Sequence, residues 1–140
     1  MYNSKQEIFD KVWQHFITNN NPPGFNSVEK GCCYNTETGG CAIGCLLSKE
    51  DAQTLDNYSD GRFPLTVAGA VDIYPEIIYK YISNQVDTSF LTDLQVAHDT
   101  SVYHENGVLV NFRHMLTIRL TTLADKHFLS VPFVSVLGKE

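Results

Sequence analysis

Hydrophobic side chains recur at helical spacing from the start of the chain. Six of them form one broad face between residues 4 and 19, namely Ile8, Phe9, Val12, Trp13, Phe16 and Ile17. Ser4, followed three residues later by Glu7, fits a capping box, in which two side chains satisfy two backbone N–H groups. The prolines and glycine at residues 22–24 cannot continue a helix. The pattern therefore predicts a helix over residues 4–19 and a break after it.

Further apolar stripes predict helices along the rest of the chain. Ser48 and Thr66 are suitable N-caps, because their hydroxyl oxygens accept from the first free backbone N–H groups. Pro75 forbids a continuous helix through this region but suits the first turn of a new one. The predicted helices are residues 48–56, 66–73, 75–83, 89–98 and 111–127. Residues 104–107 are expected to form a loop.

All four cysteines lie in one stretch, residues 32–47, which we name the cysteine segment. Two short apolar runs, residues 28–34 and 41–47, flank the turn-forming sequence NTETGG and predict a β-hairpin. The sequence thus predicts a mainly helical α+β fold with five or six helices and one small cysteine-bearing β-hairpin. A single domain is expected over residues 1–140, in which residues 128–140 form an apolar tail that packs down or binds a partner.

Composition and charge narrow the classes of function. The chain has 140 residues, 43% of them hydrophobic, and a net charge of −6. Its Lys and Arg residues are scattered singly, whereas nucleic-acid binding needs a concentrated basic patch. No apolar run approaches the ~20 residues that span a bilayer, and the start of the chain lacks a signal-peptide pattern. We therefore expect a cytoplasmic protein without a nucleic-acid or membrane partner, whose cysteines are thiols or ligands sooner than disulfides.

Three interpretations of the cysteines stay open. In the predicted hairpin Cys41 and Cys45 share a face, with Cys33 opposite, so these residues can simply fill the core. The inward positions of His98 and His127 on their helices allow a second interpretation, a zinc site with three thiolates and one imidazole. The third is a reactive thiol, whose proton an imidazole oriented by a carboxylate would remove. The metal candidates are Cys33, Cys41, Cys45, His98 and His127, and the catalytic candidates are Cys41, Cys45, His98 and Asp99.

Four segments taken together resemble a group of small phage and bacterial proteins. They are the Cys33-Tyr34 pair, the C-A-I-G-C-L segment at residues 41–46, the L-x-x-L-Q-x-x-H-D segment at residues 91–99 and the L-A-x-x-H segment at residues 123–127. The resemblance covers most of the chain up to about residue 128. That group has no established activity, so the resemblance implies a phage or mobile-element setting and no mechanism.

A protein-binding role is the leading expectation. The chain carries no phosphate-binding loop and no nucleophile elbow. The apolar tail and the tyrosine-rich stretch around Tyr79 are candidates for a protein interface. We therefore expect a small accessory factor, encoded by a phage or mobile element, that binds another protein and inhibits or modulates a host system. Two alternatives are a hydrolase-like enzyme that depends on Cys and His or on zinc, and a small-ligand-binding protein. No cofactor other than zinc is expected.

Overall fold

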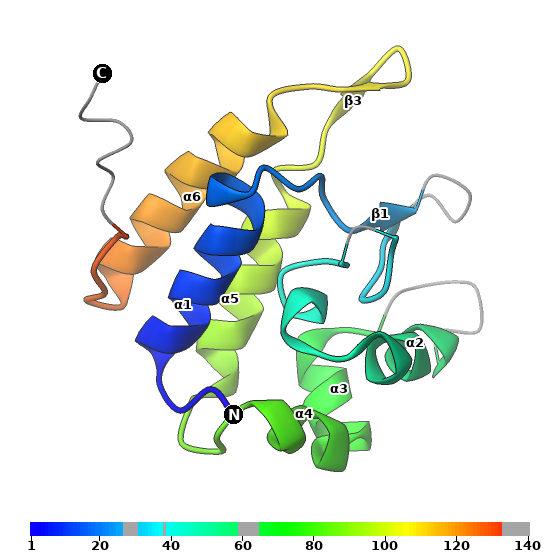
Figure 1. The fold of residues 1–140 in the computed structure, drawn as a ribbon, viewed down its shortest axis with the longest axis vertical. Helices are drawn as coiled ribbons and strands as arrows, with labels where there is room; N and C mark the ends of the chain where they lie inside the picture. The colour runs from blue at the N-terminus through cyan, green and yellow to red at the C-terminus, as the bar shows by residue number, and fades with distance from the viewer. Residues whose placement is uncertain (27–30, 38, 59–64, 133–140) are drawn as a thin grey trace.

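The computed structural model describes residues 1–26, 31–37, 39–58 and 65–132. These residues form six α-helices, two short helices of other types and two small antiparallel sheets (Figure 1). The α-helices are α1 (Lys5–Trp13), α2 (Lys49–Tyr58), α3 (Val67–Ile73), α4 (Pro75–Tyr81), α5 (Thr88–Asp99) and α6 (Phe112–Lys126). The prediction of a mainly helical α+β fold is confirmed.

Helix α5 lies at the centre of the arrangement. Helices α6 and α3 pack against it, and α1 packs against the cysteine segment at residues 44–46 (Figure 1). Its apolar face is fully buried at Phe90, Leu91 and Leu94. Each such side chain contributes roughly 1.5–3 kcal/mol through removal of apolar surface from water. The stable core on this face fixes the position of the opposite face of α5.

The first helix begins as predicted. The Ser4 hydroxyl accepts from the Glu7 backbone N–H at 3.2 Å, and the Glu7 carboxylate accepts from the Asn3 N–H at 2.6 Å. The reciprocal bond thus reaches one residue further back than in the usual capping box. After Trp13 the helix widens into a π-helical turn, η1 (Gln14–Thr18), which ends where Asn20 takes a left-handed conformation with φ of 56°.

The predicted hairpin between residues 28–34 and 41–47 is wrong. Strand β2 (Gly31–Cys32) pairs with β1 (Phe25–Asn26), which precedes it, and residues 28–30 lie outside the described part of the chain. Residues 41–47 form a tight turn and a 3-10 helix, η2 (Gly44–Leu46). Their backbone bonds are helical, with the Cys45 N–H donating to the Cys41 carbonyl at 2.9 Å.

Two glycines explain why this run coils. Gly40 has a left-handed φ of 86°, which reverses the chain just before Cys41. A Cβ on Gly40 or Gly44 would lie 1.8 or 1.9 Å from the Tyr34 carbonyl oxygen, so both glycines pack directly against that backbone. The cysteine segment therefore folds into a compact turn and a short helix, in which apolar side chains at consecutive positions are buried.

A hairpin forms where a loop was predicted. Strands β3 (His104–Glu105) and β4 (Val108–Leu109) pair, and the ribbon projects from the body of the molecule (Figure 1). The turn residues Asn106 and Gly107 have φ of 53° and 79°, as a type I′ turn requires. The Asn-Gly dipeptide is the signal that favours this turn.

The start of the predicted tail packs down. The Ser130 N–H donates to Gln6 Oε1 at 2.9 Å, and Gln6 Nε2 donates to the Ser130 carbonyl at 2.8 Å. Leu129 and Val131 pack against the core. Residues 133–140, the rest of that tail, lie outside the described residues. Among the described helices, none has the length and apolar character to cross a membrane.

Candidate functional site

A cavity of about 460 Å³ lies between the cysteine segment, the start of α3 and the outer face of α5. Helix α5 presents one continuous face to it, at helical spacing. The lining residues are Cys33, Tyr34, Cys41, Leu65, Thr66, Val67, Thr92, Gln95, Val96 and Asp99. The volume falls within the range of sites that bind small molecules, about 300–1,000 Å³.

Hydrogen bonds join polar side chains of α5 in the wall of this cavity. Gln95 accepts from the Ile43 backbone N–H at 3.2 Å through Oε1 and donates to Asp99 Oδ1 at 2.9 Å through Nε2. The same carboxylate oxygen accepts from His98 Nδ1 at 2.8 Å. The Asp99 side chain is 43% exposed, whereas the His98 side chain is fully buried. Gln95 and His98 therefore fix the carboxylate at the cavity wall.

His98 connects α5 to the cysteine segment through Gly24. Its Nε2 accepts a hydrogen bond of 3.0 Å from the Gly24 backbone N–H, so the ring proton lies on Nδ1, which faces Asp99. The Gly24 carbonyl accepts from the Cys33 N–H at 2.8 Å, and the Cys33 carbonyl accepts from the Cys41 N–H at 3.0 Å. These bonds hold the cavity wall in place.

The thiols of Cys41 and Cys45 are not activated in this arrangement. Burial raises the pKa of Cys41 well above its ordinary value, and the nearby Asp99 carboxylate raises it further. Burial likewise raises the pKa of Cys45 to about 12, and its Sγ donates to the Ala42 carbonyl at 3.2 Å. In the described part of the chain no hydrogen bond joins either thiol to His98. The predicted Cys–His–Asp residues are neighbours, but the two ring nitrogens of His98 bond to the Gly24 N–H and to Asp99.

The predicted zinc ligands do not fit a metal. Both ring nitrogens of His98 are already used by Gly24 and Asp99. His127 lies elsewhere, with Nε2 bonded to Asp93 at 2.8 Å and Nδ1 at 3.4 Å from Lys5 Nζ. Across the residues that the structure describes, no group of three or more His, Cys, Asp or Glu side chains could hold a metal ion. The set Cys33, Cys41, Cys45, His98 and His127 is thus not assembled.

The sequence predictions missed most of the cavity. They included Cys33, Cys41 and Asp99, but they did not include Gln95 or the start of α3. The signal was present in α5, where Thr92, Gln95, Val96 and Asp99 recur at i, i+3, i+4 and i+7 opposite the apolar stripe. Tyr34 of the cysteine segment also lines the cavity. Its hydroxyl donates to the Leu65 carbonyl at 2.5 Å, and burial raises its pKa.

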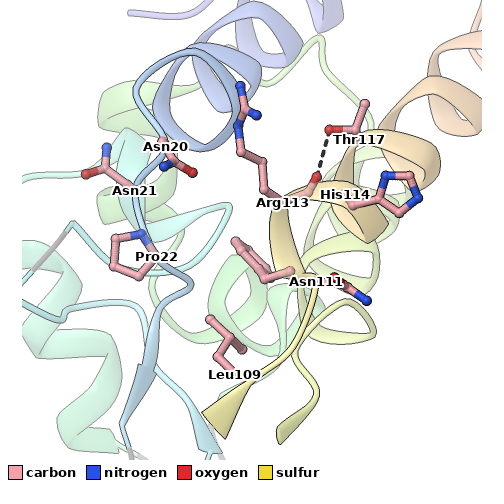
Figure 2. A pocket seen from close by; sticks show the side chains of 9 residues that line it. Asn20, Asn21, Pro22, Leu109, Asn111, Arg113, His114 and Thr117 are labelled. Atoms are coloured by element: carbon pink, nitrogen blue, oxygen red, sulfur yellow. Dashed lines mark hydrogen bonds between the residues drawn. The ribbon is translucent and has the colours of Figure 1, made fainter.

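A second cavity, of about 610 Å³, lies between the chain after η1 and the start of α6 (Figure 2). Its lining residues are Asn20, Asn21, Pro22, Leu109, Asn111, Phe112, Arg113, His114 and Thr117. Arg113 reaches from α6 towards η1, where its Nε donates to the Ile17 carbonyl at 2.8 Å. The Thr117 hydroxyl donates to the Arg113 carbonyl at 2.7 Å. Arg113 thus satisfies a carbonyl at the end of η1 and joins two helices.

Comparison of the chain with protein-family models, with curated proteins and with solved structures finds no match.

Proposed function

We propose that the protein binds a small organic ligand in the cavity between the cysteine segment and α5. The observation that carries this proposal is the convergence of Thr92, Gln95 and Asp99 on one wall of a largely apolar cavity. A concave, mainly apolar site with a few fixed polar groups is the usual form of a small-molecule site. Two segments that resemble the phage and bacterial group, residues 41–46 and 91–99, both contribute to it.

The walls of the cavity are held before any ligand arrives. The Tyr34 backbone N–H donates to Asp56 of α2 at 2.9 Å, and its hydroxyl donates to Leu65 ahead of α3. Gln95 is fixed at both ends of its amide. Walls that need no reordering lower the entropy cost of binding. These bonds therefore support a binding role over a loose packing gap.

A blocking variant tests this proposal. Val96 lines the cavity and is 51% exposed, so Val96→Trp fills the mouth of the cavity without disturbing the core. Ile118 on α6 has nearly the same exposure, 49%, and Ile118→Trp is the matched control. Small compounds of positive, negative and zero charge are screened by melting temperature and by ¹H–¹⁵N NMR. A ligand at 100 times its Kd stabilises the fold by about 2.7 kcal/mol.

We expect at least one compound to stabilise the wild type and Ile118→Trp, and to leave Val96→Trp unchanged. Its NMR shifts should map to Thr92, Gln95 and Val96. A screen in which no compound binds, or in which the shift survives in Val96→Trp, rejects the proposal.

A second candidate function is the protein-binding accessory role, acting in the cytoplasm on a host protein. It is supported by Tyr103 and Val108 on the projecting β3–β4 hairpin, which are 58% and 64% exposed. Exposed aromatic and aliphatic side chains on a projecting ribbon suit a protein interface. The test is co-purification with the tagged chain from host cells, compared with the double variant Tyr103→Ser/Val108→Ser and with Ile118→Ser. A stoichiometric partner that only the double variant loses supports this role, and equal recovery by all three rejects it.

A further inference from the structure

The lining of the cavity is mainly apolar and carries little charge. Of the ten described residues that line the cavity, Asp99 alone belongs to the charged types Asp, Glu, Lys and Arg. Leu65, Val67 and Val96 form the apolar part of the lining. The lining therefore combines a mainly apolar surface with one carboxylate.

One oxygen of that carboxylate is left for a ligand. Asp99 Oδ1 accepts from both His98 and Gln95, while Oδ2 has no hydrogen-bond partner in the described part of the chain. A carboxylate offers about four acceptor positions, and charge-assisted bonds are roughly twice as strong as neutral ones. Oδ2 is thus available to a donor that enters the cavity.

The carboxylate also lacks a cationic partner. Gln95 is neutral, and the Gly24 N–H bonded to Nε2 holds His98 in its neutral Nδ1–H form. In the described part of the chain no Lys or Arg side chain forms an ion pair with Asp99. Its negative field reaches across the cavity: burial is the main cause of the raised pKa of Tyr34 and of Cys41, and Asp99 adds to both.

We propose that the cavity selects a compact apolar ligand that carries an ammonium group, and that Asp99 binds this group. This inference rests on the proposed ligand-binding function. An ammonium supplies up to three donors and the missing positive charge, whereas a carboxylate ligand would meet a like charge. A neutral ligand gains the apolar contacts alone.

Three probes of similar shape test the charge preference. They are 2-phenylethylammonium, 2-phenylethanol and 3-phenylpropanoate, titrated into the full chain at low ionic strength and followed by ¹H–¹⁵N NMR. We expect the ammonium probe to bind at least 10-fold more tightly than the alcohol, and the carboxylate probe to bind most weakly. The shifts should map to Thr92, Gln95, Val96 and Asp99.

Asp99→Asn removes the charge and keeps an Oδ1 that accepts from His98 and Gln95. We expect the preference for the ammonium probe to fall below about 3-fold in this variant, because only the ionic part is lost. Asp125→Asn, which neutralises an exposed carboxylate on α6, should keep the full preference. If Asp99→Asn does not fold, the wild type is titrated at 0.05 M and 0.5 M NaCl. The higher salt concentration should then weaken the binding of the ammonium probe and leave the affinity of the alcohol unchanged.

The outcomes separate the two proposals. If the alcohol binds as tightly as the ammonium probe, or if Asp99→Asn keeps the preference, the charge selection is rejected while ligand binding stands. If the preference in the wild type does not respond to salt, the charge selection is also rejected. If none of these probes and no compound of the wider screen binds, the ligand-binding function itself is rejected.

Discussion

The backbone N–H of Gly24 donates a hydrogen bond of 3.0 Å to Nε2 of the buried His98, 74 residues further along the chain. This bond joins the segment after η1 to the central helix α5. It uses the nitrogen that a metal or a thiol proton would need. The same histidine bonds to Asp99 on its other side, at 2.8 Å. The histidine that the sequence marks as a chemical group is therefore a structural link, and it positions the carboxylate that faces the cavity.

Gly24 should tolerate no side chain. A Cβ at this position would lie 2.2 Å from the Cys41 nitrogen and 2.2 Å from the Gly40 carbonyl carbon, both of which are backbone atoms. We expect Gly24→Ala to lower the free energy of unfolding by about 3 kcal/mol, because the chain must separate from the cysteine segment and lengthen the bond to His98. Urea denaturation followed by circular dichroism measures this change.

Gly69→Ala is the matched control for that substitution. Its Cβ would lie 2.9 Å from Leu65 Cδ1, the end of a flexible side chain, and alanine favours helix α3. We expect a change below about 1 kcal/mol of either sign, because these two effects oppose one another. Equal effects of the two substitutions would contradict the close packing at Gly24.

The thiol of Cys45 should make the fold less stable in alkali. Burial raises its pKa from an ordinary 9.0 to about 12 in the folded chain. The protonated thiol therefore leaves the fold fully stable below about pH 9. That stability is lost as the pH rises towards 12, because the thiol of the unfolded chain releases its proton at a lower pH. The free energy of unfolding should fall by up to about 1.4 kcal/mol per pH unit for this thiol.

Unfolding in urea at pH 8, 9 and 10 measures that slope in the wild type and in Cys45→Ala. The variant should show a shallower slope, since the tyrosines and other thiols contribute equally to both chains. Alkylation at pH 8, located by mass spectrometry, should be at least 100-fold slower at Cys45 in the folded chain than in urea. Identical slopes, or rapid alkylation of the folded chain, would show that the fold does not raise the pKa of this thiol.

The long periodic elements could be predicted from the sequence, and the cysteine segment could not. Helices α1, α5 and α6 follow apolar stripes that local spacing alone reveals. Cys41, Ile43 and Cys45 also alternate, as strand residues do, but such a short run does not distinguish a strand from a helical turn. The contacts of Gly40 and Gly44 with the Tyr34 carbonyl decide the outcome, and these depend on the fold.

The candidate site was predictable only in part, for a related reason. The sequence marks Cys41, His98 and Asp99 as residues that could carry chemistry, and these three are neighbours in the structure. It does not show that His98 Nε2 accepts a hydrogen bond from the Gly24 backbone N–H. Almost every residue type has this donor, so the amino-acid sequence does not indicate which one bonds to the histidine. The face of α5 that includes Gln95 could be predicted from the helical spacing of its residues, since it lies opposite the buried apolar stripe.

The β3–β4 hairpin should depend on Gly107 and melt independently of the core. Gly107 has a left-handed φ of 79°, and a Cβ there would meet nothing within 4 Å, so the cost of a side chain is backbone strain alone. We expect Gly107→Ala to weaken the hairpin by about 1 kcal/mol. Hydrogen exchange should speed up at the Val110 N–H, which donates to the Tyr103 carbonyl at 2.9 Å.

Asn106→Gly is the control for the hairpin, because glycine adopts the φ of 53° at that position without strain. Exchange at Val110 should be unchanged or modestly faster in this variant, and exchange in α5 should be unchanged in both. Loss of protection in α5 after Gly107→Ala would show that the hairpin and the core unfold as one unit.

Phe128 should be replaceable by glycine with a gain in stability. It follows α6 with a left-handed φ of 59°, and its side chain is 95% exposed. The Phe128 N–H donates to the Asp125 carbonyl at 3.3 Å and the Leu129 N–H to the Ala124 carbonyl at 2.8 Å, which are the bonds of a Schellman motif. Glycine is the usual residue at this position, and Phe128→Gly should raise the free energy of unfolding by about 1 kcal/mol. Phe128→Ala keeps the strained backbone and should change it by less than half as much. If the glycine variant is instead less stable than wild type, the phenyl ring makes contacts that stabilise the fold, and the Phe128 side chain is not exposed in solution.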